Sequence, residues 1–140
     1  MKKYKKGYTT GVFDMFHVGH LNILKKSKEL CDYLLVGVTV DELVSYKNKR
    51  AIINFEDRKT IVESIKYVDE VTSQSDMNKI DAFKKHNFDV IFVGSDWKGT
   101  DKWDLLEKDF KKLNVDIVYF DYTIKISSTT LKKHLDKLDK

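Results

Sequence analysis

Short apolar runs alternate along the chain with segments whose apolar residues recur every three or four positions, a pattern that predicts strands and helices in turn. The run at 33–40 is almost entirely apolar, which is typical of a strand buried on both faces of a sheet. Residues 41–53 are polar and lysine-rich and are predicted to form a loop or a short helix. Strands are predicted at 8–13, 33–40, 68–71, 90–93 and 115–120, and helices at 21–30, 55–67, 79–86, 105–113 and 128–138.

This alternation indicates β-α-β units, and such units build a parallel sheet with helices on both faces. We therefore expect an α/β fold, a Rossmann-like doubly wound sheet of about five parallel strands. The chain has no proline, and no repeat or linker interrupts it, so residues 1–140 are expected to form a single domain. Ligands of such sheets bind beyond the carboxyl ends of the strands, which directs attention to the loops that follow them.

The charge balance favours anionic partners, because the net charge is +4. The lysines are spread along the whole chain, which favours a solvated basic surface, and no nucleic-acid partner is expected. No apolar run approaches the ~18 residues of a membrane span. Cys31 is the only cysteine and cannot form an internal disulfide, and no signal-peptide pattern is present, so a cytoplasmic protein is expected.

The loop after the first predicted strand carries two histidines, His17 and His20, around Gly19 at the start of a helix. Free backbone N–H groups and the positive end of the helix dipole attract anions there, and histidines can donate hydrogen bonds to phosphate oxygens. A metal would need further ligands, which favours phosphate over metal, and no metal-binding residue is assigned. Capping of the helix by the two histidines is the simpler alternative.

A second polar motif lies near the end of the chain, where Ile126 is followed by Ser127, Ser128, Thr129 and Thr130 at the start of the last predicted helix. Serine and threonine are good helix N-caps, and the same helix end attracts anions. A plain cap and a phosphate site are both consistent with these residues.

Together the two motifs resemble the HxGH signature and the Ser-Thr signature of the HxGH nucleotidyltransferases, in the cytidylyltransferase family and most closely its glycerol-3-phosphate branch. The resemblance covers essentially the full length and extends to 41–42, 67–71 and 94–99. It implies an HxGH-type fold and an enzyme that transfers CMP from CTP to a small phosphorylated alcohol, with glycerol-3-phosphate favoured. The products are a CDP-alcohol for teichoic acid or capsule synthesis and pyrophosphate. It further implies Mg²⁺ bridging the substrate phosphates, and a homodimer.

The resemblance also implies site residues, matched position by position to the family motifs. The catalytic residues implied are His17, His20, Lys47, Ser128 and Thr129. The CTP-binding residues implied are Gly11, Val12, Phe13, Asp14, Gly19, Gly94, Asp96, Ser127 and Thr130. The acceptor-binding residues implied are Lys49, Arg58, Trp97 and Lys125. The simpler interpretations are a solvated basic surface for Lys47, Lys49 and Arg58, a turn residue for Asp14, and core packing for Trp97 and especially for Trp103.

Three positions depart from the family pattern. Thr123 stands where related enzymes commonly carry an arginine, Ile126 where a glycine is often found, and Val12 where the glycerol-phosphate branch usually has a threonine. These departures leave choline- or ethanolamine-phosphate open as the acceptor. An adenylyltransferase and a non-catalytic nucleotide- or RNA-binding module are the remaining alternatives. A Rossmann dehydrogenase is disfavoured, because no GxGxxG turn follows the first strand.

Overall fold

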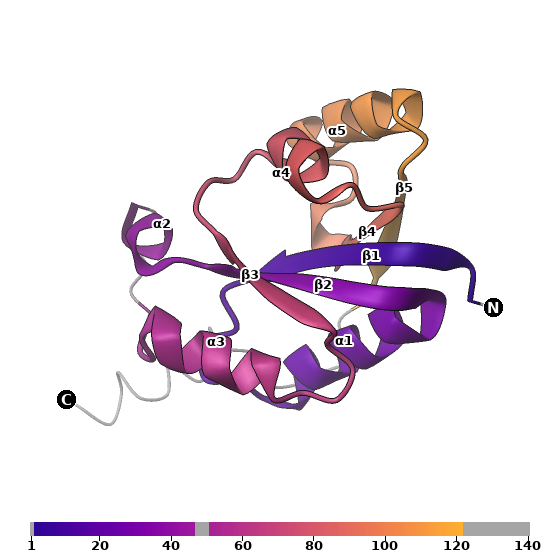
Figure 1. The fold of residues 1–140 in the computed structure, drawn as a ribbon. Coiled ribbons are helices and arrows are strands. Elements are labelled where there is room, and N and C mark those ends of the chain that lie inside the picture. Colours follow the sequence, from indigo (N-terminus) through magenta and orange to yellow (C-terminus); the bar gives the residue numbers. More distant parts are fainter. Residues whose placement is uncertain (1, 47–50, 122–140) are drawn as a thin grey trace.

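The computed structural model describes residues 2–46 and 51–121 and confirms the expected α/β architecture. Five parallel strands form one sheet in the order β3-β2-β1-β4-β5 (Figure 1). The elements are β1 (Tyr4–Gly11), α1 (Val18–Leu30), β2 (Cys31–Thr39), α2 (Asp41–Tyr46), α3 (Phe55–Glu63), β3 (Glu70–Gln74), α4 (Lys79–His86), β4 (Val90–Gly94), the 3-10 turn η1 (Ser95–Trp97), α5 (Asp101–Lys112) and β5 (Asp116–Phe120).

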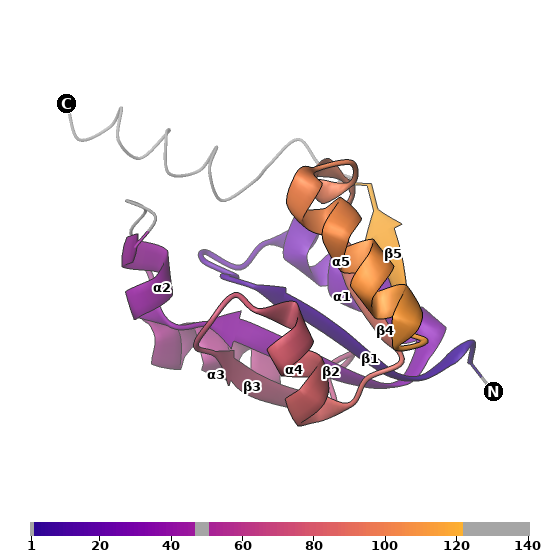
Figure 2. The ribbon, with the colours of Figure 1, turned by 90° about the horizontal axis from the view of Figure 1, so that it is seen from above.

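Helices cover both faces of the sheet (Figures 1 and 2). On one face, Leu24 of α1 and Val62 of α3 pack against Leu34, Val36 and Val38 of β2. The opposite face is covered by α4 and α5, and its core cluster is built from Tyr8, Leu35, Phe88, Ile91, Trp103, Phe110 and Val115. Burial on both faces explains why β2 is nearly all apolar.

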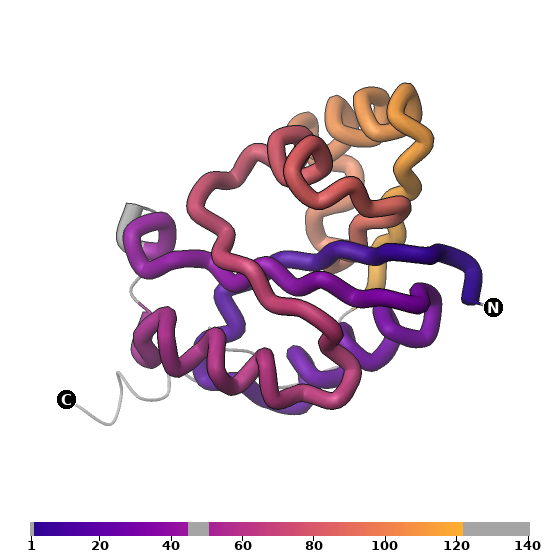
Figure 3. The backbone as a smooth tube through the Cα atoms, viewed as in Figure 1, coloured from indigo at the N-terminus to yellow at the C-terminus, as the bar shows by residue number. Residues whose placement is uncertain are grey.

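The strand order reverses at β1, which lies in the middle of the sheet (Figure 3). The chain first builds outwards through β2 and β3, then crosses to the other side of β1 and adds β4 and β5. Gly7 allows this central packing, because a Cβ there would lie 2.5 Å from the Phe92 ring and 2.9 Å from the Cys31 sulfur. The reversal lies between β1 and β4, and ligands of such sheets bind beyond the carboxyl ends of the strands at that point.

Several predicted boundaries were wrong for local reasons. The first strand begins at Tyr4 and ends at Gly11, because Phe13 leaves the strand in a left-handed conformation with φ 55°. The third strand runs over Glu70–Gln74; it is an edge strand whose polar residues the apolar pattern did not recognise. Helix α5 begins at Asp101, where the Thr100 side chain caps it, and not at 105 as predicted. The prediction missed its first turn because that turn is mostly polar.

The remaining predictions concern the end of α3, the position of Trp103 and the last predicted helix. Helix α3 ends at Glu63, before the predicted end at 67, and the Ser64 hydroxyl donates to the Thr60 carbonyl there. Trp103 is buried in the second core cluster, as preferred from the sequence. The final helix predicted at 128–138 lies outside the described residues. In the part of the chain that is described, no helix combines the length and the apolar character needed to cross a membrane.

Candidate active site

His17 and His20 open helix α1 directly beyond the carboxyl end of β1. His17 is the N-cap residue, and its Nδ1 accepts a hydrogen bond from the Gly19 N–H at 3.0 Å. The His17 N–H in turn donates to Nδ1 of His20 at 3.2 Å, which completes a capping box. The two rings stack with their centroids 4.0 Å apart. The two histidines therefore cap the helix.

The capping bonds also fix where each imidazole carries its proton. Because Nδ1 accepts a hydrogen bond in both rings, a neutral ring must carry its proton on Nε2. Burial lowers the pKa of His17. Burial, followed by the neighbouring His17, lowers the pKa of His20 to about 4, although Asp14 acts in the opposite direction. At neutral pH both rings are consequently neutral donors through Nε2.

One of these donors is left without a partner. Nε2 of His17 is buried and makes no hydrogen bond to any described residue. Such an atom costs free energy unless an acceptor reaches it, so it marks a place where a ligand acceptor fits. It lies at a helix start, where backbone N–H groups favour anionic ligands. The geometry suits a phosphate oxygen.

The loop that leads to the histidines has an unusual backbone. Phe13 and Met15 adopt φ angles of 55° and 49°, a left-handed conformation that costs a non-glycine residue roughly 1–2 kcal/mol. The rings of Phe13 and Phe16 lie 5.5 Å and 5.2 Å from the His20 ring, between centroids. Both rings pack against His20 and contribute to its burial, and burial is the main cause of its lowered pKa.

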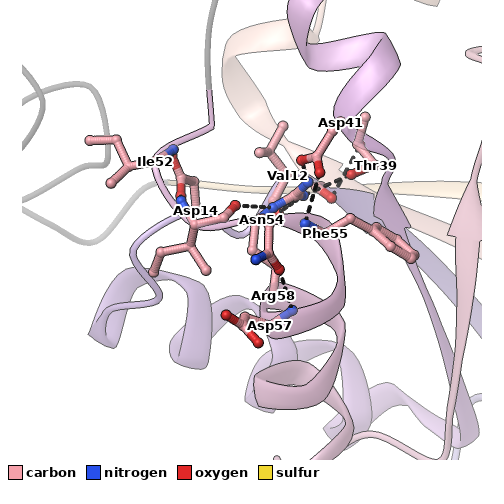
Figure 4. Close-up of polar contacts among 11 residues, drawn as sticks. Val12, Asp14, Thr39, Asp41, Ile52, Asn54, Phe55, Asp57 and Arg58 are labelled. Atoms are coloured by element: carbon pink, nitrogen blue, oxygen red, sulfur yellow. Dashed lines mark hydrogen bonds and ion pairs between the residues drawn. The ribbon is translucent and has the colours of Figure 1, made fainter.

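Asp14 is buried, and its carboxylate accepts two backbone hydrogen bonds from the segment before α3. Oδ2 accepts from the Ile52 N–H at 2.8 Å and Oδ1 from the Ile53 N–H at 2.9 Å (Figure 4). Asp14 was expected to bind CTP, and that role stays a prediction. In the structure, these two hydrogen bonds join the loop between β1 and α1 (residues 12–17, the histidine loop) to the segment before α3.

The Arg58 side chain is fully buried and joins four segments (Figure 4). Its Nε donates to the Ile53 carbonyl at 2.8 Å. Nη1 donates to the Val12 carbonyl at 2.8 Å and to the Thr39 carbonyl at 2.7 Å. Nη2 forms an ion pair with Asp41 at 2.6 Å. The acceptor contact expected of Arg58 stays a prediction, and this bonding favours a different role.

Two residues near the site were not singled out from the sequence for these roles. Asp41 pairs with Arg58 and also accepts from the Phe55 N–H at 3.1 Å. Lys79 is buried at the start of α4 and donates to the Thr10 hydroxyl at 2.9 Å. A polar residue directly after a buried strand could have indicated Asp41. No signal indicated Lys79, because the sequence is rich in lysine.

The remaining expected site residues fall into two groups. Gly11 ends β1, Gly94 ends β4, and Asp96 and Trp97 lie in η1 beyond β4, with the Trp97 side chain 43% exposed. The core position that was the alternative for Trp97 is therefore not observed. Seven expected site residues lie outside the described residues: Lys47, Lys49, Lys125, Ser127, Ser128, Thr129 and Thr130. Within 2–46 and 51–121, no three His, Cys, Asp or Glu side chains gather as metal ligands.

Known proteins resemble the chain over nearly its whole length. A Bacillus spizizenii protein named glycerol-3-phosphate cytidylyltransferase is 38% identical over 96% of this chain and 99% of its own length. An FAD synthase from Pyrococcus horikoshii is 36% identical over 91% of this chain and 88% of its own. The solved structure of a lipopolysaccharide core biosynthesis protein from Thermoplasma volcanium has a TM-score of 0.72 and 26% identity, and covers 88% of this chain and 99% of that chain.

The parallel α/β sheet and the match to cytidylyltransferases over nearly the whole chain together define an α/β nucleotidyltransferase. The family model described as cytidylyltransferase-like matches residues 8–134. The chain belongs to the cytidylyltransferase-like family, and the resemblance found in its two motifs is confirmed.

Proposed function

We propose that this protein, acting as one domain over residues 1–140, transfers CMP from CTP to glycerol-3-phosphate and releases pyrophosphate. The buried, unpartnered Nε2 of His17 carries the proposal, because it offers a fixed donor to a phosphate oxygen at a helix start. The similarity to a glycerol-3-phosphate cytidylyltransferase over 96% of the chain supports the choice of nucleotide and acceptor.

The reaction needs no covalent enzyme intermediate. A phosphate oxygen of glycerol-3-phosphate attacks the α-phosphorus of CTP in line, a new P–O bond forms, and the bond to the pyrophosphate oxygen breaks. His17 and His20 stabilise the charge on the equatorial oxygens by donating Nε2–H bonds, and as neutral donors they need not transfer a proton. Catalysis then rests on positioning and electrostatics.

The other residues take roles that follow from the family motifs. Lys47, Ser128 and Thr129 stabilise the triphosphate, assisted by Ser127 and Thr130. The turns after β1 and β4 hold CTP through Gly11, Val12, Phe13, Gly19, Gly94 and Asp96. Lys49, Lys125 and Trp97 are assigned to acceptor binding, and the exposure of the Trp97 ring beyond β4 supports a contact with the acceptor.

Mg²⁺ is proposed as the metal that neutralises the substrate phosphates. The carboxylates nearest the histidine loop, Asp14 and Asp41, already accept hydrogen bonds from backbone N–H groups or Arg58. The donor set therefore fits a metal held mainly by substrate phosphates and water. A homodimer, a cytoplasmic location and a role in teichoic acid or capsule synthesis complete the proposal.

The test is pyrophosphate release by the purified protein with Mg²⁺, each of the four nucleoside triphosphates, and a panel of acceptors. The panel holds glycerol-3-phosphate, choline phosphate, ethanolamine phosphate and ribitol-5-phosphate, with His17→Ala as the control. Release that needs CTP and glycerol-3-phosphate, and is lost in the variant, supports the proposal.

The other outcomes reassign the protein. CTP-dependent release with another acceptor keeps the site and changes the pathway. ATP-dependent release favours adenylyl transfer, in line with the FAD synthase relative. No release with any pair favours a non-catalytic nucleotide- or RNA-binding module.

A further inference from the structure

Asp14, Asp41 and Arg58 form one connected group, which we call the clasp. It connects the histidine loop to α3 and to the segment before α3 through two kinds of hydrogen bond. In one the loop supplies the acceptor, and in the other it receives backbone N–H donors. Arg58 donates to the Val12 carbonyl, and Asp14 accepts from the Ile52 and Ile53 N–H groups. Both ends of the loop residue Phe13 are thereby fixed to one neighbouring segment.

The clasp also anchors that segment to the sheet. Arg58 donates to the Thr39 carbonyl at the end of β2 and to the Ile53 carbonyl, while Asp41 accepts from the Phe55 N–H. Four N–H donations of one guanidinium are thus made to protein acceptors, and none of its side-chain surface is exposed. A residue bonded in this way has no free face for a substrate.

What the clasp holds in place is the left-handed turn that leads to the histidines. Val12 and Asp14 flank Phe13, whose φ is 55° and whose ring shields His20. A strained turn persists only where surrounding bonds over-determine it. If the clasp loosens, the Phe13 ring loses its fixed position, the His20 imidazole becomes more hydrated, and the two stacked imidazoles become less well aimed.

We infer that Arg58, with Asp41 and Asp14, is a positioning group for His17 and His20, and that it acts through the loop and not by contact with the acceptor. Its effect on turnover rests on the proposed function. A displacement of about 1 Å at a reacting centre costs up to roughly 100-fold in rate, so the clasp is expected to govern kcat.

The kinetic test uses Arg58→Lys, which keeps the charge but not the planar fork. We expect kcat to fall by roughly 10- to 100-fold, with the KM values for CTP and glycerol-3-phosphate changing less than about threefold. Asp41→Asn, at a half-exposed partner, gives a milder fall and serves if Arg58→Lys does not fold. A rise of about tenfold or more in the acceptor KM alone would overturn the inference in favour of a direct acceptor contact.

Matched controls lie on the same helix. Lys59→Gln and Asp57→Asn change charge next to the clasp without removing any of its bonds, and both are expected to leave kcat within about twofold. Equal losses in the controls and in Arg58→Lys would indicate a general charge effect and overturn the positioning role.

A second readout does not depend on catalysis. NMR titration of the His17 and His20 ring protons follows hydration of the imidazoles in wild type, Arg58→Lys and Asp41→Asn. We expect the His20 pKa to rise from about 4 towards its usual value of 6.5 when the clasp is loosened. His17 and Asp14, which face His20, are followed in the same titration. An unchanged His20 pKa in folded variants contradicts the inference, even if the protein proves to have no transferase activity.

Discussion

The segments that follow the carboxyl ends of β1 and β4 differ in how many hydrogen bonds fix them to the rest of the protein. Beyond β1, the clasp joins the loop, β2 and α3 through hydrogen bonds of 2.6–3.1 Å around a fully buried arginine. Beyond β4, η1 begins at Ser95 without a side-chain cap, since Gly94 holds the N-cap position, and Asp96, Trp97 and Lys98 are exposed. Fixed geometry and adaptable surface thus occupy neighbouring strand ends, which suits charge stabilisation at the first and ligand recognition at the second.

The largest expected effect on the rate comes from removing the unpartnered Nε2–H donor of His17, beyond the carboxyl end of β1. His17→Asn keeps a good helix N-cap but loses Nε2–H, so kcat is expected to fall by roughly 100- to 1000-fold while the melting temperature changes little. Pyrophosphate release and thermal unfolding measure the two effects. A variant that keeps its full rate would remove the histidine from the mechanism.

The next effect concerns stability on the same side. Arg58→Met removes the Arg58 donor from the Asp41 carboxylate, from the buried Thr39 carbonyl and from the part-buried Val12 and Ile53 carbonyls. We expect it to lower the free energy of unfolding by about 3 kcal/mol. Urea denaturation measures the change. Asp57→Asn is the exposed control on the same helix, and a loss of the same size there would show that the clasp is not special.

Acid is expected to lower the free energy of unfolding in a defined pH window through His20. His20 has a folded pKa of about 4, below its ordinary 6.5, so the unfolded chain binds the proton first as the pH falls. Stability is therefore unaffected by His20 above pH 6.5, falls as the pH drops through the window, and stops falling near 4. The expected loss is roughly 3 kcal/mol.

Urea midpoints of wild type and His20→Gln between pH 8 and 4 isolate this contribution, because the carboxylates titrate in both proteins. The two curves are expected to converge as the pH falls. Parallel curves would show that His20 is not the group responsible.

The smallest effect is expected on the adaptable side. Trp97→Ala should change the free energy of unfolding by no more than about 0.5 kcal/mol, because the ring is 43% exposed, while it raises the acceptor KM severalfold. Trp103→Ala is the contrasting control: that ring is buried in the core, and its loss should cost about 3–5 kcal/mol. If both variants are equally destabilised, the distinction between the two strand ends fails.

The fold was predictable because its signals are local. The helix at Lys79–His86 was predicted with its correct bounds, since Asn78 caps its start and Asn87 ends it in a left-handed conformation. The buried strands were recognisable from unbroken apolar runs. Boundaries were missed where a polar first turn or a polar edge strand carried no apolar period, as in α5 and β3.

The site was predictable only in part. The motif located His17 and His20, but no local pattern connects Arg58 with the carbonyl of Val12, which is 46 positions away. Such a bond depends on how α3 packs beside the first loop, and that packing follows from the assembled sheet. A buried arginine and a surface arginine look the same in a sequence, which is why the clasp was not foreseen.

The central position of β1 has a consequence for synthesis on the ribosome. β1 is made before β4, yet β4 pairs with one of its edges, where the Thr9 hydroxyl donates a hydrogen bond to the Phe92 carbonyl. At roughly 5–20 residues per second, that partner emerges several seconds later. Until then the nascent chain carries an open strand edge, so yield in a fast, crowded expression host should depend on shielding by chaperones.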